Sequence, residues 1–146
     1  MIPKVNINLS INSIERNIEP SKNHRMDINK ELINGYNDLI DGVKQAVFKI
    51  LNTERYNHYI YSKNYGVELE SLFGEPISYV CPEIERRITE ALIQDDRIVS
   101  VDSFSFDIKE KRTVSVTFIV HTIFGDFESV KEVRFWCMKI LAMNKY

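Results

Sequence analysis

Cysteine and histidine are scarce in this chain. Only Cys81 and Cys137 occur among 146 residues, and they lie far apart in the sequence. A disulfide framework or a cysteine-rich metal cluster needs more thiols at closer spacing. We therefore expect two reduced, packed thiols. His24, His58 and His121 are scattered, so we expect them to be surface or packing residues, and we expect no bound metal or other cofactor.

The chain also lacks a large excess of charge of either sign. The chain has 19 basic and 21 acidic residues mixed along its length, with a formal net charge of −2. Holding a nucleic-acid backbone requires a basic surface that releases counterions. We therefore expect no nucleic-acid partner.

No apolar run in the sequence approaches the roughly 20 residues that cross a bilayer. The N-terminus has asparagines where a secretory signal peptide has its apolar segment. We expect no membrane contact, and we expect the product to stay in the cytoplasm where it is made unless a larger assembly carries it out.

Motifs of the common enzyme classes are also missing. The sequence has no P-loop, no dinucleotide-binding fingerprint and no Cys-x-x-Cys pair. Glu68 with Glu70, or Asp95 with Asp96, could supply the two carboxylates that a glycosidase holds roughly 5–10 Å apart across its cleft. Such acidic pairs more commonly lie on a solvated surface. The nearby tyrosines more commonly pack in a core or cover a sheet than form a sugar-binding platform. We expect no enzymatic activity.

A helix and an aromatic segment form the centre of the pattern. The apolar stripe of the helix repeats at helical spacing and consists of Val43, Ala46, Val47, Ile50 and Leu51. Asp38 or Asp41 can cap its start, and residues 52–53 are a plausible stop. Four tyrosines between Tyr56 and Tyr65 are too dense to continue the helix, so they predict an extended segment that turns at residues 63–66.

A second helix is predicted after a short helical turn that ends at Gly74. Pro82 suits its first position, and Glu83 and Glu85 complement its N-terminal dipole. Its buried stripe consists of Ile84, Ile88, Ala91 and Leu92. Asp95 and Asp96 follow at the C-terminal end, where carboxylates oppose the dipole. Local stability therefore does not explain them.

The remaining segments alternate as strands do. Residues 5–11 alternate apolar residues with Asn and Ser, and they predict either an arm that pairs with a partner's sheet edge or an edge strand of this chain's own sheet. Residues 25–28 and 31–36 predict a short hairpin or two extended pieces. From Ile98, Val99 and Val101 share one face, and the following phenylalanines have the opposite parity. That change predicts a bulge near residues 102–103.

Two further strands complete the predicted sheet. The first alternates through Val114, Val116, Phe118 and Val120 after a charged turn at residues 109–112. Gly125 and Asp126 predict a two-residue hairpin. The last strand runs through Val130, Val133 and Phe135, which we expect to offer one apolar face to a partner. Its charged residues, Glu128, Lys131, Glu132 and Arg134, would discourage pairing between copies of this chain.

The expected fold class is α+β. We predict one small domain at residues 25–136, with two main helices packed on a mostly antiparallel β-sheet. An N-terminal strand or arm covers residues 1–24, and a C-terminal tail covers residues 137–146.

The order of these elements resembles the baseplate wedge proteins of contractile phage tails. That family comprises the sheath initiators, with XkdS-like members in defective prophages and a related component in type VI secretion baseplates. The resemblance rests on GVKQAVFKILNTERYNHYIYSKNYGVELESLFG at residues 42–74, EIERRITEALIQDDRIVSVDSF at residues 83–104, and the β-hairpin that follows. It covers about residues 25 to 135 and leaves the N-terminal arm outside.

The resemblance implies an interface at the exit of the second helix. Better-known members have a Glu-Pro-Arg tripeptide there, which docks onto a helical core bundle of the wedge. The matching positions here are Asp95, Asp96 and Arg97, so the acid and the arginine are kept in kind while proline is replaced. Since a polar residue at a helix exit has little core burial, we expect loss of Arg97 to cost the isolated domain no more than about 1 kcal/mol.

The resemblance also implies a function. A non-enzymatic wedge component would join other wedge proteins and present strands to the first ring of sheath subunits, using Val130, Val133 and Phe135. The tail tube or hub is a further candidate partner. Assembly would occur in the bacterial host cytoplasm, and the protein would end in the baseplate of a phage tail or a tail-like bacteriocin. The alternatives are a peptidoglycan hydrolase, since some members carry a lysozyme-like label, and a cytoplasmic adaptor.

Overall fold

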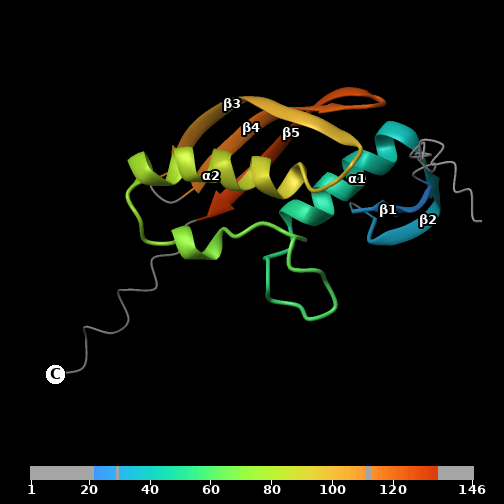
Figure 1. Cartoon of the computed structure of the whole chain (residues 1–146), viewed down its shortest axis with the longest axis horizontal. Coiled ribbons are helices and arrows are strands. Elements are labelled where there is room, and N and C mark those ends of the chain that lie inside the picture. Colours follow the sequence, from blue (N-terminus) through green and yellow to red (C-terminus); the bar gives the residue numbers. More distant parts are fainter. Residues whose placement is uncertain (1–21, 29, 111–112, 135–146) are drawn as a thin grey trace, which may run out of the picture.

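The computed structural model of the chain describes residues 22–28, 30–110 and 113–134 (Figure 1). The elements, in chain order, are β1 (Asn23–Asp27), β2 (Leu32–Asn37), α1 (Leu39–Leu51), the 3-10 turn η1 (Glu70–Leu72), α2 (Ile77–Leu92), β3 (Ile98–Glu110), β4 (Thr113–Thr122) and β5 (Gly125–Arg134). The α+β prediction is confirmed. The expected strand at residues 5–11, Phe135 and the C-terminal tail at residues 137–146 lie outside the described residues.

The main sheet is an antiparallel meander in the order β3-β4-β5. The alternating residues of β4 are buried as predicted, because one face of the central strand packs under the helices (Figure 1). The opposite face carries polar side chains from all three strands, including Asp102, Thr117, His121 and Glu128. The core therefore lies between one face of the sheet and the two helices.

The predicted stripe of α1 is confirmed. Val43, Val47, Ile50 and Leu51 are all in the core, and Ala46, the fifth member, is half-buried at its margin. Asp38 is the N-cap and accepts a hydrogen bond from the Leu39 backbone N–H at 2.7 Å. The helix ends at Leu51, as the sequence indicated.

The predicted start of α2 is wrong. The helix begins at Ile77, and Pro82 lies inside it. Pro76 is extended, with φ −63° and ψ 142°, and the first turn buries Val80 on the stripe that Ile84 continues. Burial of Val80 in that extra turn outweighs the hydrogen bond that Pro82 cannot donate. The residue whose carbonyl would have accepted this bond, Ser78, is exposed.

The parity of β3 was predicted in part. A register shift between Asp102 and Ser105, with Ser103 at φ 57°, confirms the predicted bulge. A second irregularity between Ile98 and Ser100 was not predicted. It reverses the parity, so Val99 is exposed while Val101 is buried, and the prediction that they share a face is wrong.

The hairpin between β4 and β5 turns earlier than predicted. Residues 123–124 form the loop, and Gly125 pairs with Thr122 as the first residue of β5. The Thr122 hydroxyl donates to the Gly125 carbonyl at 2.6 Å and accepts from the Phe124 backbone N–H at 3.2 Å. Gly125 has a φ of +129°, so glycine is needed after the turn rather than within it.

Val130 and Val133 do not share the apolar face that was predicted for β5. Val133 is 4% exposed and belongs to the core, whereas Val130 is 58% exposed on the opposite face. The two residues are three positions apart, and side chains alternate with a period of two. Lys131 also points inward, where its Nζ donates to Asn52 Oδ1 at 2.8 Å.

The predicted hairpin at the N-terminal side is confirmed as a separate two-stranded sheet of β1 and β2. Gln45 of α1, which is buried, fastens β1 to the helix. Its amide donates to the His24 carbonyl at 2.8 Å, and its oxygen accepts from the Met26 N–H at 2.9 Å. The side chain makes the pair of hydrogen bonds that a neighbouring strand would make. The hairpin therefore docks on α1 through a polar residue outside the predicted apolar stripe.

Candidate protein-interaction surfaces

The exit of α2, which comprises residues 95–97, is held by backbone hydrogen bonds at both ends. The Asp95 N–H donates to the Leu92 carbonyl at 3.1 Å, and the Ile98 N–H donates to the Asp95 carbonyl at 3.0 Å. The Ile123 N–H donates to the Arg97 carbonyl at 3.1 Å, which links the exit to the β4–β5 loop. These contacts fix the segment where the sequence placed its candidate interface.

Asp95 and Arg97 form a charged pair within this segment. Arg97 Nε donates to Asp95 Oδ1 at 2.8 Å, a second donor of the fork reaches Oδ2, and the Arg97 backbone N–H also donates to Oδ1 at 3.1 Å. The side chains are 18% exposed for Arg97 and 11% for Asp95. Burial disfavours the carboxylate, but the hydrogen bonds from Arg97 outweigh burial and hold the pKa of Asp95 below its ordinary value.

These contacts overturn part of the sequence interpretation. Asp95 does have a local structural role, because it organises the turn that leads from α2 into β3. Asp96, by contrast, is exposed. The structure thus brings Asp95 and Arg97 together and leaves Asp96 facing solvent.

A pocket of about 310 Å³ adjoins this exit. The end of α1, the loop after it and the end of α2 line the pocket, through Ile50, Ser62, Asn64, Tyr65, Ala91, Gln94 and Asp95. Burial raises the pKa of Tyr65, and the nearby Tyr61 and Asp95 raise it further. Tyr65 is therefore a neutral donor at neutral pH, beside a carboxylate.

The segment after α1 is a loop rather than the extended segment that its tyrosines predicted, although Tyr65 does pack against the core. We call residues 55–66 the tyrosine loop. Its base is closed by a parallel bridge, in which the Val67 N–H donates to the Thr53 carbonyl at 3.0 Å and the Arg55 N–H donates to the Val67 carbonyl at 3.2 Å. Gly66 has a φ of +94°, and a Cβ there would lie 2.6 Å from the Thr53 carbonyl oxygen. The predicted turn at residues 63–66 is confirmed.

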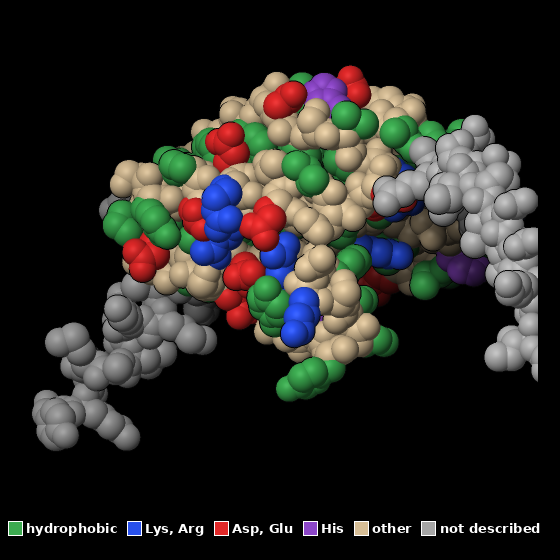
Figure 2. Space-filling view, in the orientation of Figure 1, with side chains coloured by type: hydrophobic (Ala, Val, Ile, Leu, Met, Phe, Trp, Pro, Cys, Tyr) green, Lys and Arg blue, Asp and Glu red, His purple; other side chains and the backbone are tan. Residues whose placement is uncertain are grey.

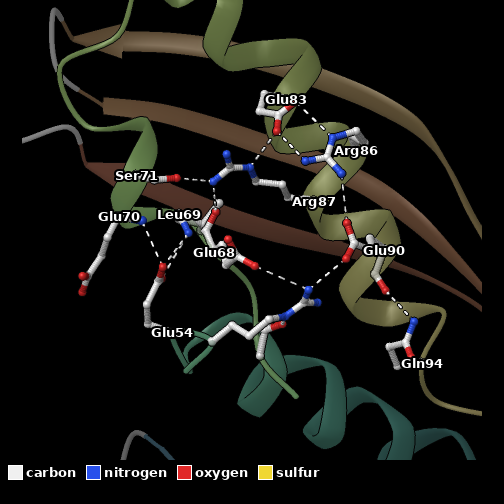
Figure 3. Close-up of polar contacts among 12 residues, drawn as sticks. Glu54, Glu68, Leu69, Glu70, Ser71, Glu83, Arg86, Arg87, Glu90 and Gln94 are labelled. Carbon is white, nitrogen blue, oxygen red and sulfur yellow. Dashed lines mark hydrogen bonds and ion pairs between the residues drawn. The ribbon is translucent and has the colours of Figure 1, made fainter. Parts of the chain in front are cut away.

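A polar network fastens the base of the tyrosine loop to α2 (Figure 3). The buried Arg55 guanidinium donates to Glu90 Oε1 at 2.9 Å and to the Gly66 carbonyl at 3.2 Å, and it lies 3.6 Å from Glu68. Glu54 accepts from the Leu69 N–H at 2.9 Å. The Glu54 carboxylate therefore stabilises the start of η1, although burial raises its pKa.

Arginines of α2 extend this network. Arg86 and Arg87 both donate to Glu83 and lower its pKa to about 2. Arg87 also donates to the Glu68 carbonyl at 2.6 Å (Figure 3). Glu83 therefore binds arginines in the helix interior and does not complement the helix start, which corrects the prediction. The i,i+3 and i,i+4 spacing could have revealed the pairs within α2, but nothing local in the sequence links Arg55 to Glu90.

The acidic residues considered for catalysis either pair with arginine or face solvent. Glu68 is the ion-pair partner of Arg55, and Glu70 is exposed. A glycosidase needs one carboxyl group with a raised pKa, whereas the pKa of Asp95 is lowered. Within the described ranges, no group of three or more His, Cys, Asp or Glu residues could hold a metal ion, and no helix is long and apolar enough to cross a membrane.

His121 lies on the polar face of the sheet. Its Nε2 is 3.0 Å from Asp102 Oδ2, and its Nδ1 is 3.0 Å from Asp126 Oδ2. The two carboxylates raise its pKa. This contact joins all three strands of the sheet at one end. It agrees with the predicted surface role for His121. Cys81 is a free thiol whose pKa is raised by burial, which agrees with the predicted packed thiol.

Sequence and structure comparisons give consistent results. The profile of the contractile injection system sheath initiator family matches residues 14–125. The chain is 37% identical over 124 residues to the phage-like element PBSX protein XkdS of Bacillus subtilis strain 168, an alignment that covers 80% of this chain and 84% of that protein. Its fold is similar to that of a putative tail lysozyme from Geobacter sulfurreducens, with a TM-score of 0.56 and 18% identity over 66% of this chain and 90% of the other. At that identity the likeness concerns the fold alone.

Proposed function

Because the chain belongs to the sheath-initiator family of contractile injection systems, we propose that it starts sheath assembly from the baseplate wedge. Membership of the family gives the protein a structural role in a contractile tail, together with sheath and baseplate components. The finer proposal has two contacts. The exit of α2 joins another wedge protein, and the free edge of β5 pairs with a strand of the first sheath ring.

The observation that carries the proposal is the regular outer edge of β5. All ten residues of the strand pair with β4 without a register shift, and β5 is an edge strand among the described strands. The other edge strand, β3, has several register irregularities, which usually obstruct strand addition. A partner strand would therefore add to β5 more readily than to β3.

The hairpin geometry identifies which backbone groups of β5 point away from β4. Thr122 and Gly125 close a two-residue loop, and such a closing pair is hydrogen-bonded. Hydrogen-bonded and non-hydrogen-bonded pairs then alternate along an antiparallel ladder. The backbone groups of Val133 consequently face β4, whereas those of Val130 face outward. Val130 is thus an exposed residue at the free edge, even though it shares no apolar face with Val133.

The wedge contact is supported by the preformed Asp95–Arg97 pair. Asp95 holds the guanidinium in one orientation, so less side-chain entropy is lost when a partner binds its remaining donors. Asp96 is exposed next to it, and the pocket beside Asp95 offers a cavity for a partner side chain. We propose no enzymatic activity, and assembly in the host cytoplasm.

A proline substitution tests the strand contact. Val130→Pro removes an outward N–H that β4 does not use, and edge strands tolerate proline at such positions. Val130→Ala keeps this N–H and removes more of the side chain than proline does, so it is a stringent control for the loss of side-chain contacts. We expect both variants to fold and to enter baseplates, but only Val130→Ala should give sheathed tails in electron micrographs. Normal sheaths with Val130→Pro would refute the proposed contact.

A further inference from the structure

The tip of the tyrosine loop exposes large apolar side chains. Tyr59 is fully exposed, Ile60 is 86% exposed and Tyr56 is 65% exposed. In Figure 1 the loop projects from the body of the domain beneath α1, and Figure 2 shows apolar side chains at its lower end. Single exposed apolar residues are ordinary, but several on one projecting loop mark a contact surface.

The loop is held in shape without any partner. The Tyr61 N–H donates to the His58 carbonyl at 3.2 Å, and the Tyr65 N–H donates to the Ser62 carbonyl at 3.1 Å. The rings of Tyr61 and Tyr65 stack with centroids 4.6 Å apart, and Tyr65 packs against the core. Together with the closed base at Gly66, these contacts make a compact loop of the kind that often carries function. A preformed loop loses little entropy on binding.

The position of the loop indicates which partner it meets. Ser62, Asn64 and Tyr65 line the same pocket as Gln94 and Asp95, so the loop and the exit of α2 form one continuous surface. Apart from His58 and the tyrosines, Lys63 is the one ionisable side chain between residues 56 and 66. A matching partner surface would therefore have an apolar pocket for the tip and carboxylates at its rim.

We infer that Tyr59 and Ile60 anchor the chain in an apolar pocket of the same wedge protein that contacts Arg97. This inference rests on the proposed function, because it takes the α2 exit as the wedge contact. Tyrosine and isoleucine side chains that become buried at the centre of an interface contribute much of its binding energy. The tyrosine loop, in this view, sets affinity for the wedge, and the Asp95–Arg97 pair sets the orientation.

A competition experiment tests the role of the tip. Wild-type and variant chains, present in excess over their sites, are produced together with the complete set of tail proteins, and their ratio in purified particles is measured by mass spectrometry. The Tyr59→Ser, Ile60→Ser double variant should be depleted at least about tenfold. Tyr79→Ser, which removes a tyrosine that is 53% exposed on α2, serves as the matched control and should enter at parity. Equal incorporation of the double variant would overturn the inference.

Photo-crosslinking identifies the partner and separates the two proposals. A photoreactive phenylalanine is placed at position 59 or position 96 of the full chain, and the particles are irradiated. Capture of one wedge protein from both positions supports the inference. Capture of a sheath subunit or a second copy of this chain from position 59, with a wedge protein still captured from position 96, overturns the loop contact and leaves the proposed function standing. Capture of a wedge protein from position 59 alone refutes the α2-exit contact, and it overturns the inference that one wedge protein meets both surfaces.

Discussion

Removing Arg97 should destabilise the domain more than its place at a helix exit suggests. Arg97→Ala leaves the Asp95 carboxylate, 11% exposed, with the Arg97 backbone N–H as its remaining donor in this pair. Exposed ion pairs contribute about 0–1 kcal/mol, and loss of one partner from a fully buried pair costs about 3–5 kcal/mol. This pair lies between those limits, so we expect a loss of about 2 kcal/mol at pH 7, instead of the 1 kcal/mol limit that the sequence suggested.

The pH dependence of that loss gives a second signature. The folded-state pKa of Asp95 is lowered, so its contribution to the free energy of unfolding is complete above the ordinary carboxyl pKa, about 3.9, and disappears as pH falls through the folded-state value. The difference in stability between wild type and Arg97→Ala should therefore be constant from pH 7 to about 5 and shrink below about 4. The pH window follows from the lowered pKa of a carboxyl group.

Thermal and urea unfolding of the isolated chain at several pH values measures both effects. A loss of about 2 kcal/mol corresponds to a fall in melting temperature of roughly 4–10 °C for a domain of this size. Lys44→Ala, which breaks an exposed pair with Asp41 at 3.5 Å, is the control and should change stability by less than about 0.5 kcal/mol. An Arg97→Ala variant as stable as wild type, or a deficit that is the same at pH 3 and pH 7, would refute this reasoning.

Three further predictions concern the loop base, the polar face of the sheet and catalysis. Gly66→Ala should cost at least about 1 kcal/mol more than Gly74→Ala in urea unfolding. Both glycines have φ near +93°, but only a Cβ at Gly66 would meet the Thr53 carbonyl oxygen, at 2.6 Å. Equal costs would mean that the backbone at the loop base shifts to accommodate the added methyl group. NMR titration should give His121 a pKa above its ordinary 6.5, because two carboxylates favour its charged form. The resulting stabilisation is present below pH 6.5 and is lost as pH rises through the folded-state pKa, so His121→Gln should remove this pH dependence of stability. An unshifted titration midpoint for His121 would contradict the geometry. Purified peptidoglycan should stay turbid with the pure chain; clearing that one carboxylate substitution abolishes would establish a hydrolase.

The sequence by itself determined the elements whose signals are local. The stripe of α1, the buried residues of α2, the alternation of β4 and the bulge near Ser103 are periodic patterns within one segment, and periodicity depends on the geometry of that segment alone. The exit of α2 as a candidate interface came from the resemblance of its residues to a family pattern. The α+β class followed from the order of these segments.

Only the tertiary structure decided the features that join distant segments. Pro82 lies inside α2 because burial of Val80 favours an earlier turn. The base of the tyrosine loop is fastened to α2 because Arg55 donates to Glu90, 35 positions away. The outer edge of β5, which carries Val130, is an edge of the sheet because no described strand lies beyond it. Each outcome depends on which segments meet in space. Local patterns do not contain that information, since burial and ion pairing are energies between residues that the chain brings together only on folding.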